Sequence, residues 1–230
     1  MHGWRRAIGQ SAGTLAGRTP VNRLLSKALI LSALALTASV SQAAIVVSFG
    51  GTDAGADGIT SSVAGATVFN FNNGTLPTGY TGGMLVSGSV SGQYVAPLGD
   101  TTPYLTAGST PAPGGTVNAY FGPATYNYFG LYWGSIDTWN TVRFFLDDVD
   151  VGGFTGEEVM ALGNGSTQRN RYVNFTFDSG GFNGVVLLST QPALESDNHA
   201  IAQVPEPVTL GLLGLGLMGL GFARRRCTMS

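Results

Sequence analysis

The 230-residue chain is poor in charge and in cysteine. Only 10% of its residues are Asp, Glu, Lys or Arg, whereas about 25% is usual for a soluble domain. The single cysteine, Cys227, excludes an internal disulfide framework and a cysteine-rich metal site. Apolar residues still make up 43% of the chain, and this content with so little charge argues against intrinsic disorder.

Basic residues are scarce in the middle of the chain. Residues 44–203 contain three arginines and no lysine against twelve aspartates and glutamates, which gives a net charge near −9. The other eight basic residues lie near the two ends. A segment with this negative charge repels nucleic acid and anionic lipid, and it attracts cations such as Ca²⁺. We therefore expect no nucleic-acid partner.

The first 43 residues have the organisation of a secretory signal peptide. Five basic residues precede an apolar run, residues 28–40, and Ser41-Gln42-Ala43 then supplies small residues. We expect residues 1–43 to be handled by the Sec translocon and signal peptidase, with cleavage between Ala43 and Ala44. The apolar run of 13 residues is too short to anchor the chain across a bilayer core of about 30 Å.

Residues 204–230 reverse this order. They begin with a short motif made up of Val204, Pro205, Glu206 and Pro207. An apolar stretch of 16 residues, 208–223, follows, and as a helix it reaches about 24 Å, enough for a thin bilayer core. We expect it to be a short transmembrane helix in the inner membrane. The basic cluster after it favours a cytoplasmic position for that end and acts as the membrane stop: Arg224, Arg225 and Arg226.

These three parts, in this order and spacing, resemble the PEP-CTERM sorting signal of Gram-negative bacteria. The resemblance implies recognition by an exosortase, a multi-spanning membrane enzyme with an active-site cysteine. It implies cleavage near residues 205–207 and delivery to the cell surface or the extracellular matrix, in association with exopolysaccharide. A plain single-helix anchor is the alternative interpretation of the same tail.

The segment between the two ends, residues 44–203, has the pattern of a single all-β domain. Along several short stretches an apolar residue recurs at every second position, which indicates strands with one buried face. No window of 12 residues has a helical apolar period, and Gly-rich turns separate the stretches, so we expect an antiparallel β-sandwich or jelly roll. Residues 97–116 are expected to form a long exposed loop. The predicted strands lie near residues 45–49, 67–71, 84–90, 117–121, 128–133, 141–146, 172–177, 184–190 and 194–201.

A second resemblance lies inside this domain. The stretch Tyr128–Asp137, which reads YFGLYWGSID, and the later segments Phe154–Gly156 and Leu194–Asn198 resemble a group of exosortase-dependent surface proteins. The chain departs from the group's pattern at Ser196, where an apolar residue is usual, and at His199. This resemblance implies a class of surface protein without implying a mechanism.

Residues for catalysis are few. His199 is the one histidine of residues 44–203, and it is expected to share a strand face with Asp197, where a local hydrogen bond is the simplest role. Glu157 and Glu158 are adjacent, so on a strand they would point to opposite faces, which suits paired-carboxylate hydrolysis poorly. We expect no catalytic residues and no enzyme, with a secreted hydrolase as the least favoured alternative.

Two acidic stretches are candidates for a structural Ca²⁺, which prefers six to eight oxygen ligands. The densest contains Asp147, Asp148, Asp150 and Glu157. The second is the Gly/Asp-rich stretch 51–58. The alternative is a solvated acidic surface that keeps a lysine-free domain soluble. Beyond this ion we expect no cofactor.

Aromatic residues suggest a place for a ligand. If Phe129, Leu131 and Trp133 belong to the core, Tyr128 and Tyr132 lie on the opposite face of their strand, near Trp139 in sequence. Tyr128, Tyr132 and Trp139 are therefore a candidate platform for a sugar, unless a loop covers that face. The sequence predicts a non-enzymatic exported surface or matrix protein, with a carbohydrate-binding module as the alternative.

Overall fold

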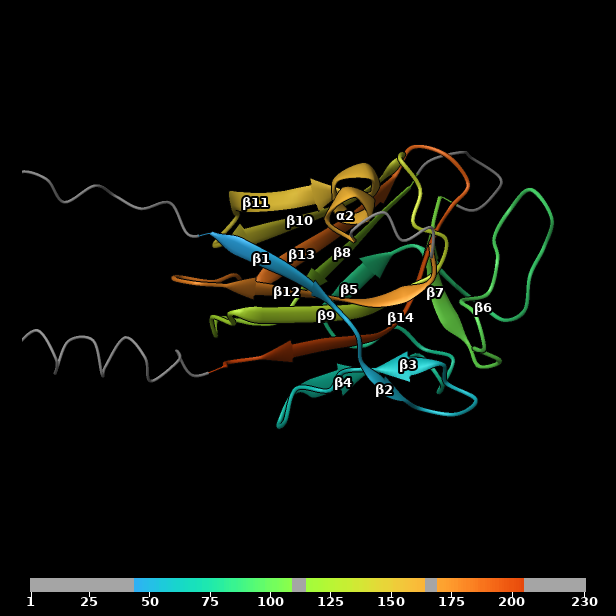
Figure 1. The fold of residues 1–230 in the computed structure, drawn as a ribbon, viewed down its shortest axis with the longest axis horizontal. Coiled ribbons are helices and arrows are strands. Elements are labelled where there is room, and N and C mark those ends of the chain that lie inside the picture. Colours follow the sequence, from blue (N-terminus) through green and yellow to red (C-terminus); the bar gives the residue numbers. More distant parts are fainter. Residues whose placement is uncertain (1–43, 109–114, 164–168, 205–230) are drawn as a thin grey trace, which may run out of the picture. The chain divides into compact units, whose positions relative to one another are not determined.

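Two antiparallel β-sheets pack face to face in the computed structural model, which describes residues 44–108, 115–163 and 169–204 (Figure 1). The predicted all-β sandwich is confirmed. The predicted signal peptide (residues 1–43), transmembrane helix (208–223) and basic tail (224–226) lie outside the described residues. Within those residues, no helix is long and apolar enough to cross a bilayer.

The larger sheet has the strand order β1-β12-β9-β14-β7-β6, and β4 pairs with β14 beside this path. Its strands are β1 (Ile45–Phe49), β12 (Arg171–Phe177), β9 (Tyr128–Trp133), β14 (Leu194–Ala202), β7 (Tyr104–Ala107), β6 (Met84–Val86) and β4 (Thr67–Phe69).

The smaller sheet has the order β11-β10-β13-β8-β5. Its strands are β11 (Val149–Thr155), β10 (Asn140–Leu146), β13 (Gly184–Ser189), β8 (Gly115–Tyr120) and β5 (Tyr80–Gly82). A separate hairpin is formed by two strands of two residues each, β2 (Thr52–Asp53) and β3 (Ile59–Thr60).

The strand positions predicted from the alternating pattern agree with these elements, but two expectations are wrong. Residues 97–116 are not one exposed loop, because they contain all of β7, whose four residues are buried, and the start of β8. The strand was hidden in a Thr/Pro/Gly-rich stretch, where polar turn residues outweigh the apolar pair Tyr104 and Leu105. A helix, α2 (Gly156–Leu162), is also present, and its seven residues are too few to give a helical apolar period over 12 residues.

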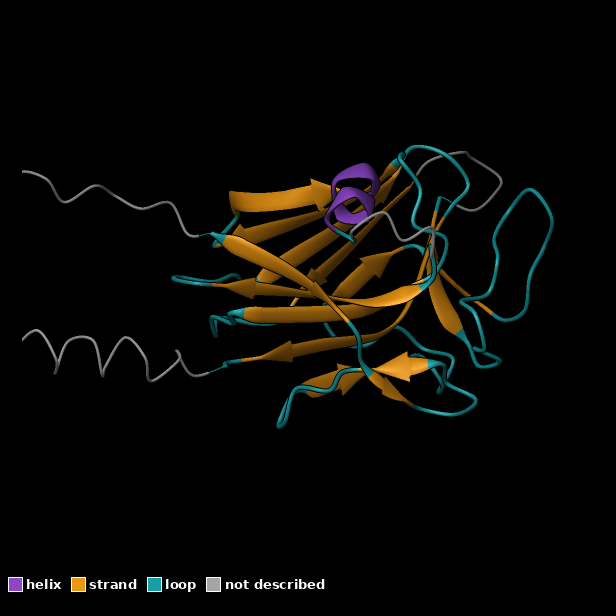
Figure 2. Ribbon diagram, in the orientation of Figure 1, coloured by secondary structure: helices purple, strands orange, loops and turns teal. Residues whose placement is uncertain are grey.

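Helix α2, drawn in purple in Figure 2, begins at a capping box. The Thr155 hydroxyl accepts a hydrogen bond from the Glu158 backbone N–H at 3.2 Å, and the Glu158 carboxylate accepts one from the Thr155 N–H at 2.8 Å. These two bonds satisfy donors that a helix N-terminus leaves unpaired, so seven residues suffice for a helix here. The bonds from Thr155 also lower the pKa of Glu158.

Phenylalanine rings fill the space between the sheets. Phe129 and Phe175 come from the larger sheet, Phe144 comes from the smaller, and Phe182 comes from the turn before β13. The rings of Phe144 and Phe175 meet edge to face at 5.3 Å between centroids, a favoured arrangement for aromatic pairs. Period-2 alternation therefore does specify this core, as predicted for Val142, Phe144, Val173, Phe175 and Phe177.

The outward face of the larger sheet is covered as well. The segment of residues 50–66, which we call the cover, lies against Tyr128, Tyr132 and Tyr172. The Ser61 hydroxyl lies 2.7 Å from the Tyr128 hydroxyl, and Val63 and Ala66 pack against Tyr128. The sandwich thus has a third, partial layer, which explains why both faces of β9 are buried.

Gly130 makes room for two of these tyrosines. A Cβ at this position would lie 2.4 Å from the Tyr128 hydroxyl and 2.7 Å from the ring and hydroxyl of Tyr172. Real Cβ atoms essentially never come so close, and both phenols are fully buried and cannot move aside. Glycine in the middle of this strand is therefore a packing requirement.

We predict that Gly130→Ala lowers the free energy of unfolding by about 1–3 kcal/mol, because it overpacks a filled site. The matched control is Gly184→Ala in β13, where a Cβ would meet Phe145 at an ordinary 3.6 Å. The control should change stability by less than about 0.5 kcal/mol. Urea unfolding followed by circular dichroism measures both, and equal losses in the two variants would contradict the packing argument.

Candidate functional site at the sorting junction

The last strand leads directly to the sorting motif predicted from the sequence. Strand β14 ends at Ala202, and Val204 is then held by the side chain of Asn127. The Asn127 amide donates to the Val204 carbonyl at 2.7 Å, and the Val204 N–H donates to the Asn127 side-chain oxygen at 2.6 Å. Because both backbone groups of Val204 are bonded, the chain leaves the domain at a fixed point just before Pro205.

The described chain enters and leaves the larger sheet at the same end. Strand pairing places Val46 beside Thr176, Thr176 beside Tyr128, and Tyr128 beside Ala202. Figure 1 shows this arrangement, with the blue start of β1 and the red end of β14 on one side of the sandwich. The loops at the other end of the sandwich therefore lie away from Val204, where the described chain ends.

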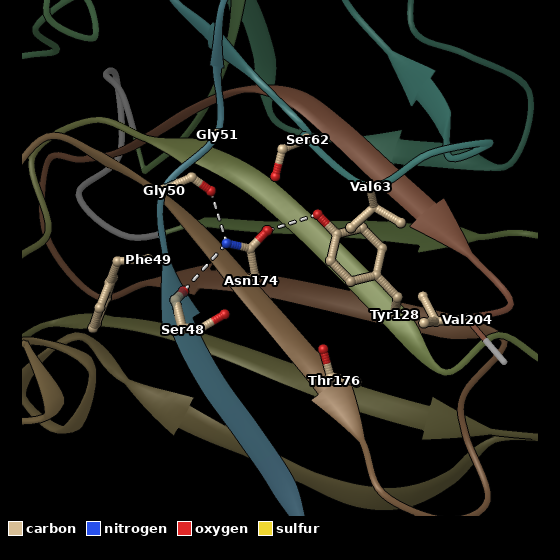
Figure 3. A pocket seen from close by; sticks show the side chains of 10 residues that line it. All are labelled: Ser48, Phe49, Gly50, Gly51, Ser62, Val63, Tyr128, Asn174, Thr176 and Val204. Atoms are coloured by element: carbon tan, nitrogen blue, oxygen red, sulfur yellow. Dashed lines mark hydrogen bonds between the residues drawn. The ribbon is translucent and has the colours of Figure 1, made fainter. Parts of the chain in front are cut away.

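An open pocket of about 450 Å³ lies beside the junction (Figure 3). In Figure 3, Tyr128 and Asn174 point toward one another across β9 and β12, and the Tyr128 hydroxyl donates to the Asn174 oxygen at 2.7 Å. The Asn174 amide donates to the Gly50 carbonyl at 2.9 Å, which ties the cover to the sheet. The lining is mostly polar: Ser48, Phe49, Gly50, Gly51, Ser62, Val63, Tyr128, Asn174, Thr176 and Val204.

The tail beyond this junction matches a known family model. The model of the PEP-CTERM protein-sorting motif covers residues 203–226, so it begins one residue after β14 ends. The chain carries a PEP-CTERM sorting motif. No curated protein matches the chain significantly. The PEP-CTERM motif indicates an exosortase-sorted extracellular protein and implies recognition by an exosortase, export, and membrane-associated sorting to the cell surface. Of the motif residues, Val204 lies inside the described part, whereas Pro205, Glu206 and Pro207 lie outside it.

The predicted aromatic platform is not formed. Tyr128 and Tyr132 are each only 1% exposed, because the cover and the loop before β7 lie over them. The Tyr132 hydroxyl donates to the Leu98 carbonyl in that loop. Trp139 is half-buried, and its indole nitrogen is buried without a hydrogen-bond partner. The alternative interpretation, in which a loop covers the face, therefore holds.

His199 lies in the interior between the sheets. Its Nδ1 is 3.0 Å from the Tyr80 hydroxyl, and its Nε2 is 2.9 Å from the Ser196 hydroxyl. Burial lowers the pKa of His199 to about 3, so the ring is neutral at physiological pH. Ser196 and His199, the two departures from the surface-protein group, are thus partners of one another.

The expected shared face of Asp197 and His199 is wrong, and a β-bulge is the reason. Asn198 has a left-handed backbone with φ of 49°, and the register with β9 shifts by one residue between Asp197 and Ala200. The extra residue reverses which side chains face inward. Ser196 and His199 therefore both face the core, whereas Asp197 points to the cover side.

The predicted Ca²⁺ ligands are not brought together. Asp147 and Asp148 lie at the turn between β10 and β11, and Asp150 follows as the second residue of β11, whereas Glu157 lies in the first turn of α2. The rest of β11, residues 151–155, runs between these aspartates and α2 and separates them from Glu157 by roughly 20 Å, so one site containing all four is wrong. Asp150 pairs with Arg143, whose hydrogen bond lowers the pKa of Asp150, and Asp147 accepts from Asn183 at 2.8 Å.

Three other aspartates, one of them in the cover itself, lie close together on the outward side of the larger sheet. Asp57, Asp100 and Asp197 each offer a carboxylate oxygen, and these oxygens lie within 4.8 Å of one another. Burial and, to a smaller extent, the charges of Asp100 and Asp57 raise the pKa of Asp197 to about 8, although the bond from the Asn198 N–H lowers it. Asp57 belongs to the Gly/Asp-rich stretch 51–58 of the sequence analysis. No sequence signal linked it to the other two, which lie far away in the chain.

The three segments that carry the second resemblance lie together in the fold. Strand β9 pairs with β14, and the Gly134 N–H donates to the Glu195 carbonyl at 2.8 Å. A Cβ at Gly156 would lie 2.1 Å from the Asp137 carbonyl oxygen, so the segment Phe154–Gly156 packs on the end of the Tyr128–Asp137 stretch. Arg169 pairs with Asp137 at the same place.

We predict that His199→Gln reduces the acid sensitivity of the fold. The pKa of His199 is lowered in the folded state, so the stabilisation is complete above the ordinary value of 6.5 and is lost as the pH falls toward 3. Between about pH 7.5 and pH 4.5 the wild-type chain should lose about 2–3 kcal/mol of unfolding free energy more than the variant. Urea unfolding at both pH values measures this, and parallel pH profiles would contradict it.

Proposed function

We propose that this protein is a non-enzymatic, exported surface or extracellular-matrix protein whose β-sandwich is displayed once an exosortase has processed its tail. The observation that carries the proposal is the sorting junction. Asn127 fixes the chain at Val204, and the sorting motif follows at once, so the recognition sequence starts where the folded domain stops. The Sec translocon and signal peptidase belong to the proposal as the export machinery for residues 1–43.

Buried acid–base groups support a role without catalysis. The pair Ser196–His199 has a hydroxyl next to an imidazole, as a hydrolase needs, but both residues are 0% exposed and the other ring nitrogen contacts Tyr80 rather than a carboxylate. Glu195 is also buried, and it accepts from the Val95 N–H and the Ser135 hydroxyl, each at 2.9 Å. These groups stabilise the fold in positions that a substrate does not reach.

Replacing Pro205, Glu206 and Pro207 with alanine should stop processing. We expect the unprocessed chain to stay in the membrane fraction, because the exosortase no longer recognises it. Cell fractionation and immunoblotting in the native host measure this, with Glu157→Ala on α2 as a control for loss of an acidic residue. Unchanged size and location of the triple variant would contradict the sorting role.

A second candidate function is binding of exopolysaccharide in the pocket beside the junction. Sugar sites combine polar groups that fix orientation with an aromatic or apolar wall. The pocket offers the hydroxyls of Ser48, Ser62 and Thr176, with Phe49 and Val63 as its apolar wall. It therefore replaces the buried platform as the place where a carbohydrate-binding module would hold a glycan.

Glycan arrays test this candidate, with the full chain in detergent as the probe. The double variant Ser48→Ala and Thr176→Ala removes two pocket hydroxyls and should weaken binding about tenfold, since each lost hydrogen bond costs about 0.5–1.5 kcal/mol. The control, Thr116→Ala with Thr141→Ala, removes two hydroxyls from the smaller sheet. Equal binding by both double variants would exclude the pocket as the glycan site.

A further inference from the structure

We propose that Asp57, Asp100 and Asp197 together bind one Ca²⁺ ion, which joins two covering loops to the last strand of the sandwich. The site is independent of the sorting motif and of the pocket beside it. It uses residues from three separate parts of the chain, and none of them belongs to the acidic turn between β10 and β11.

The geometry brings oxygen ligands together from three elements. Asp57 lies in the loop between β2 and β3, Asp100 lies in the loop before β7, and Asp197 lies in β14. Asp57 and Asp100 form an isolated antiparallel bridge, and the Thr101 N–H donates to the Ala56 carbonyl at 2.8 Å. The backbone thus fixes the two loops side by side, with one oxygen from each carboxylate within 4.8 Å of the other two.

Two buried carboxylate oxygens in this group have no partner. The Oδ1 atom of Asp197 accepts from the Asn198 N–H at 2.7 Å, and the Oδ1 atom of Asp100 accepts from the N–H and hydroxyl of Thr102, both at 2.8 Å. The Oδ2 atoms of both residues are buried without a hydrogen bond. Asp197 is 0% exposed and Asp100 is 5% exposed, so water does not reach these oxygens freely. An unsatisfied charged acceptor is costly to bury, and a bound cation would satisfy both at once.

Two of the three arginines in residues 44–203 pair with carboxylates outside this cluster. Arg143 pairs with Asp150, Arg169 pairs with Asp137, and the Arg171 guanidinium lies over the Phe49 ring at 4.7 Å. Residues 44–203 contain no lysine. Three carboxylates this close repel one another, and a bound cation would offset that repulsion.

The chemistry of the ligands points to a hard cation. All three groups are carboxylates, and the cluster contains no histidine or cysteine, which zinc and softer metals prefer. Ca²⁺ accepts irregular oxygen sets and completes its shell with carbonyls and water, whereas Mg²⁺ demands a near-octahedral shell. A ligand set from two loops and one strand suits the more tolerant ion. An extracellular destination also suits it, because extracellular modules bind Ca²⁺ with dissociation constants of about 10⁻⁴–10⁻³ M.

A proton is the competing occupant. The raised pKa of Asp197 means that, without a cation, the cluster retains a proton into the neutral range. The other titratable groups that face it are Tyr132 and Tyr104 near Asp100 and Tyr172 near Asp197, and all three phenols stay neutral because burial raises their pKa. Ca²⁺ must displace the proton, so its binding should strengthen as the pH rises.

Thermal unfolding of the full chain in mild detergent tests the site, after removal of metals with EDTA. Near pH 8, about 1 mM Ca²⁺ should raise the unfolding midpoint by at least about 3 °C, because a ligand that binds only the native state stabilises it. The same concentration of Mg²⁺ should raise it by less than about 1 °C. A midpoint shift below about 1 °C with Ca²⁺ would overturn the proposal, and an equal shift with Mg²⁺ would overturn the choice of ion.

Two variants and one control locate the ion. Asp197→Asn and Asp100→Asn should each abolish the Ca²⁺-dependent shift. In EDTA they should be at least as stable as the wild-type chain, because each removes a repelling charge. The control is Asp148→Asn, which neutralises an exposed aspartate in a left-handed turn position that asparagine also tolerates. It should keep the full shift, and loss of the shift in this control with retention in Asp197→Asn would overturn the assignment.

Direct titration covers the case in which the variants fail to fold. Isothermal titration of the wild-type chain with CaCl₂ should show one binding site per chain near pH 8 and binding at least tenfold weaker near pH 5.5, where the proton competes. No heat of binding at either pH, together with no thermal shift, would mean that the aspartates share a proton and hold no metal.

Discussion

Five consecutive polar residues buried in a central strand are the constraint on which the rest of the structure depends. Strand β14 is buried along all nine residues, and Glu195–His199 occupy its middle. Every polar group there needs a hydrogen-bond partner, because burying an unpaired group costs more free energy than a formed hydrogen bond contributes to stability. The partners come from distant segments: Val95, Ser135, Tyr80, Asp57 and Ile59. The loops of the molecule are arranged around this requirement.

This constraint links folding to sorting. The strand that satisfies the polar partners is also the strand that continues into the sorting motif, so the fixed exit at Val204 exists only when β14 is paired on both sides. Asn127 contributes twice to that exit, because its own backbone N–H bonds Ala202 and its carbonyl accepts from Phe177. A chain in which β14 has not paired with β9 therefore lacks the frame that holds Asn127 against Val204.

The sequence predicts the strands and core side chains that leave a local pattern, and it misses the burial and contacts that the cover creates. Period-2 alternation locates β9, β10 and β12 and their core side chains, since burial on one face leaves a local signature. It fails at β7, and it cannot show that Tyr128 and Tyr132 are buried, because the residues that cover them lie 30 to 70 positions away. The same distance hides the meeting of Asp57, Asp100 and Asp197, and a single-residue bulge at Asn198 reverses the predicted face of His199.

The bulge at Asn198 separates neutral from charged groups along one strand. On the inner side, Ser196 and His199 bond each other among phenylalanine rings, where burial keeps the imidazole neutral and no counter-ion is needed. On the outer side, Asp197 meets two more carboxylates that surface loops supply. Two loops cover this outer side, whereas the inner side lies between the two sheets. The proposed cation site therefore falls on the outer side of β14, where loops rather than a second sheet lie over the charged groups.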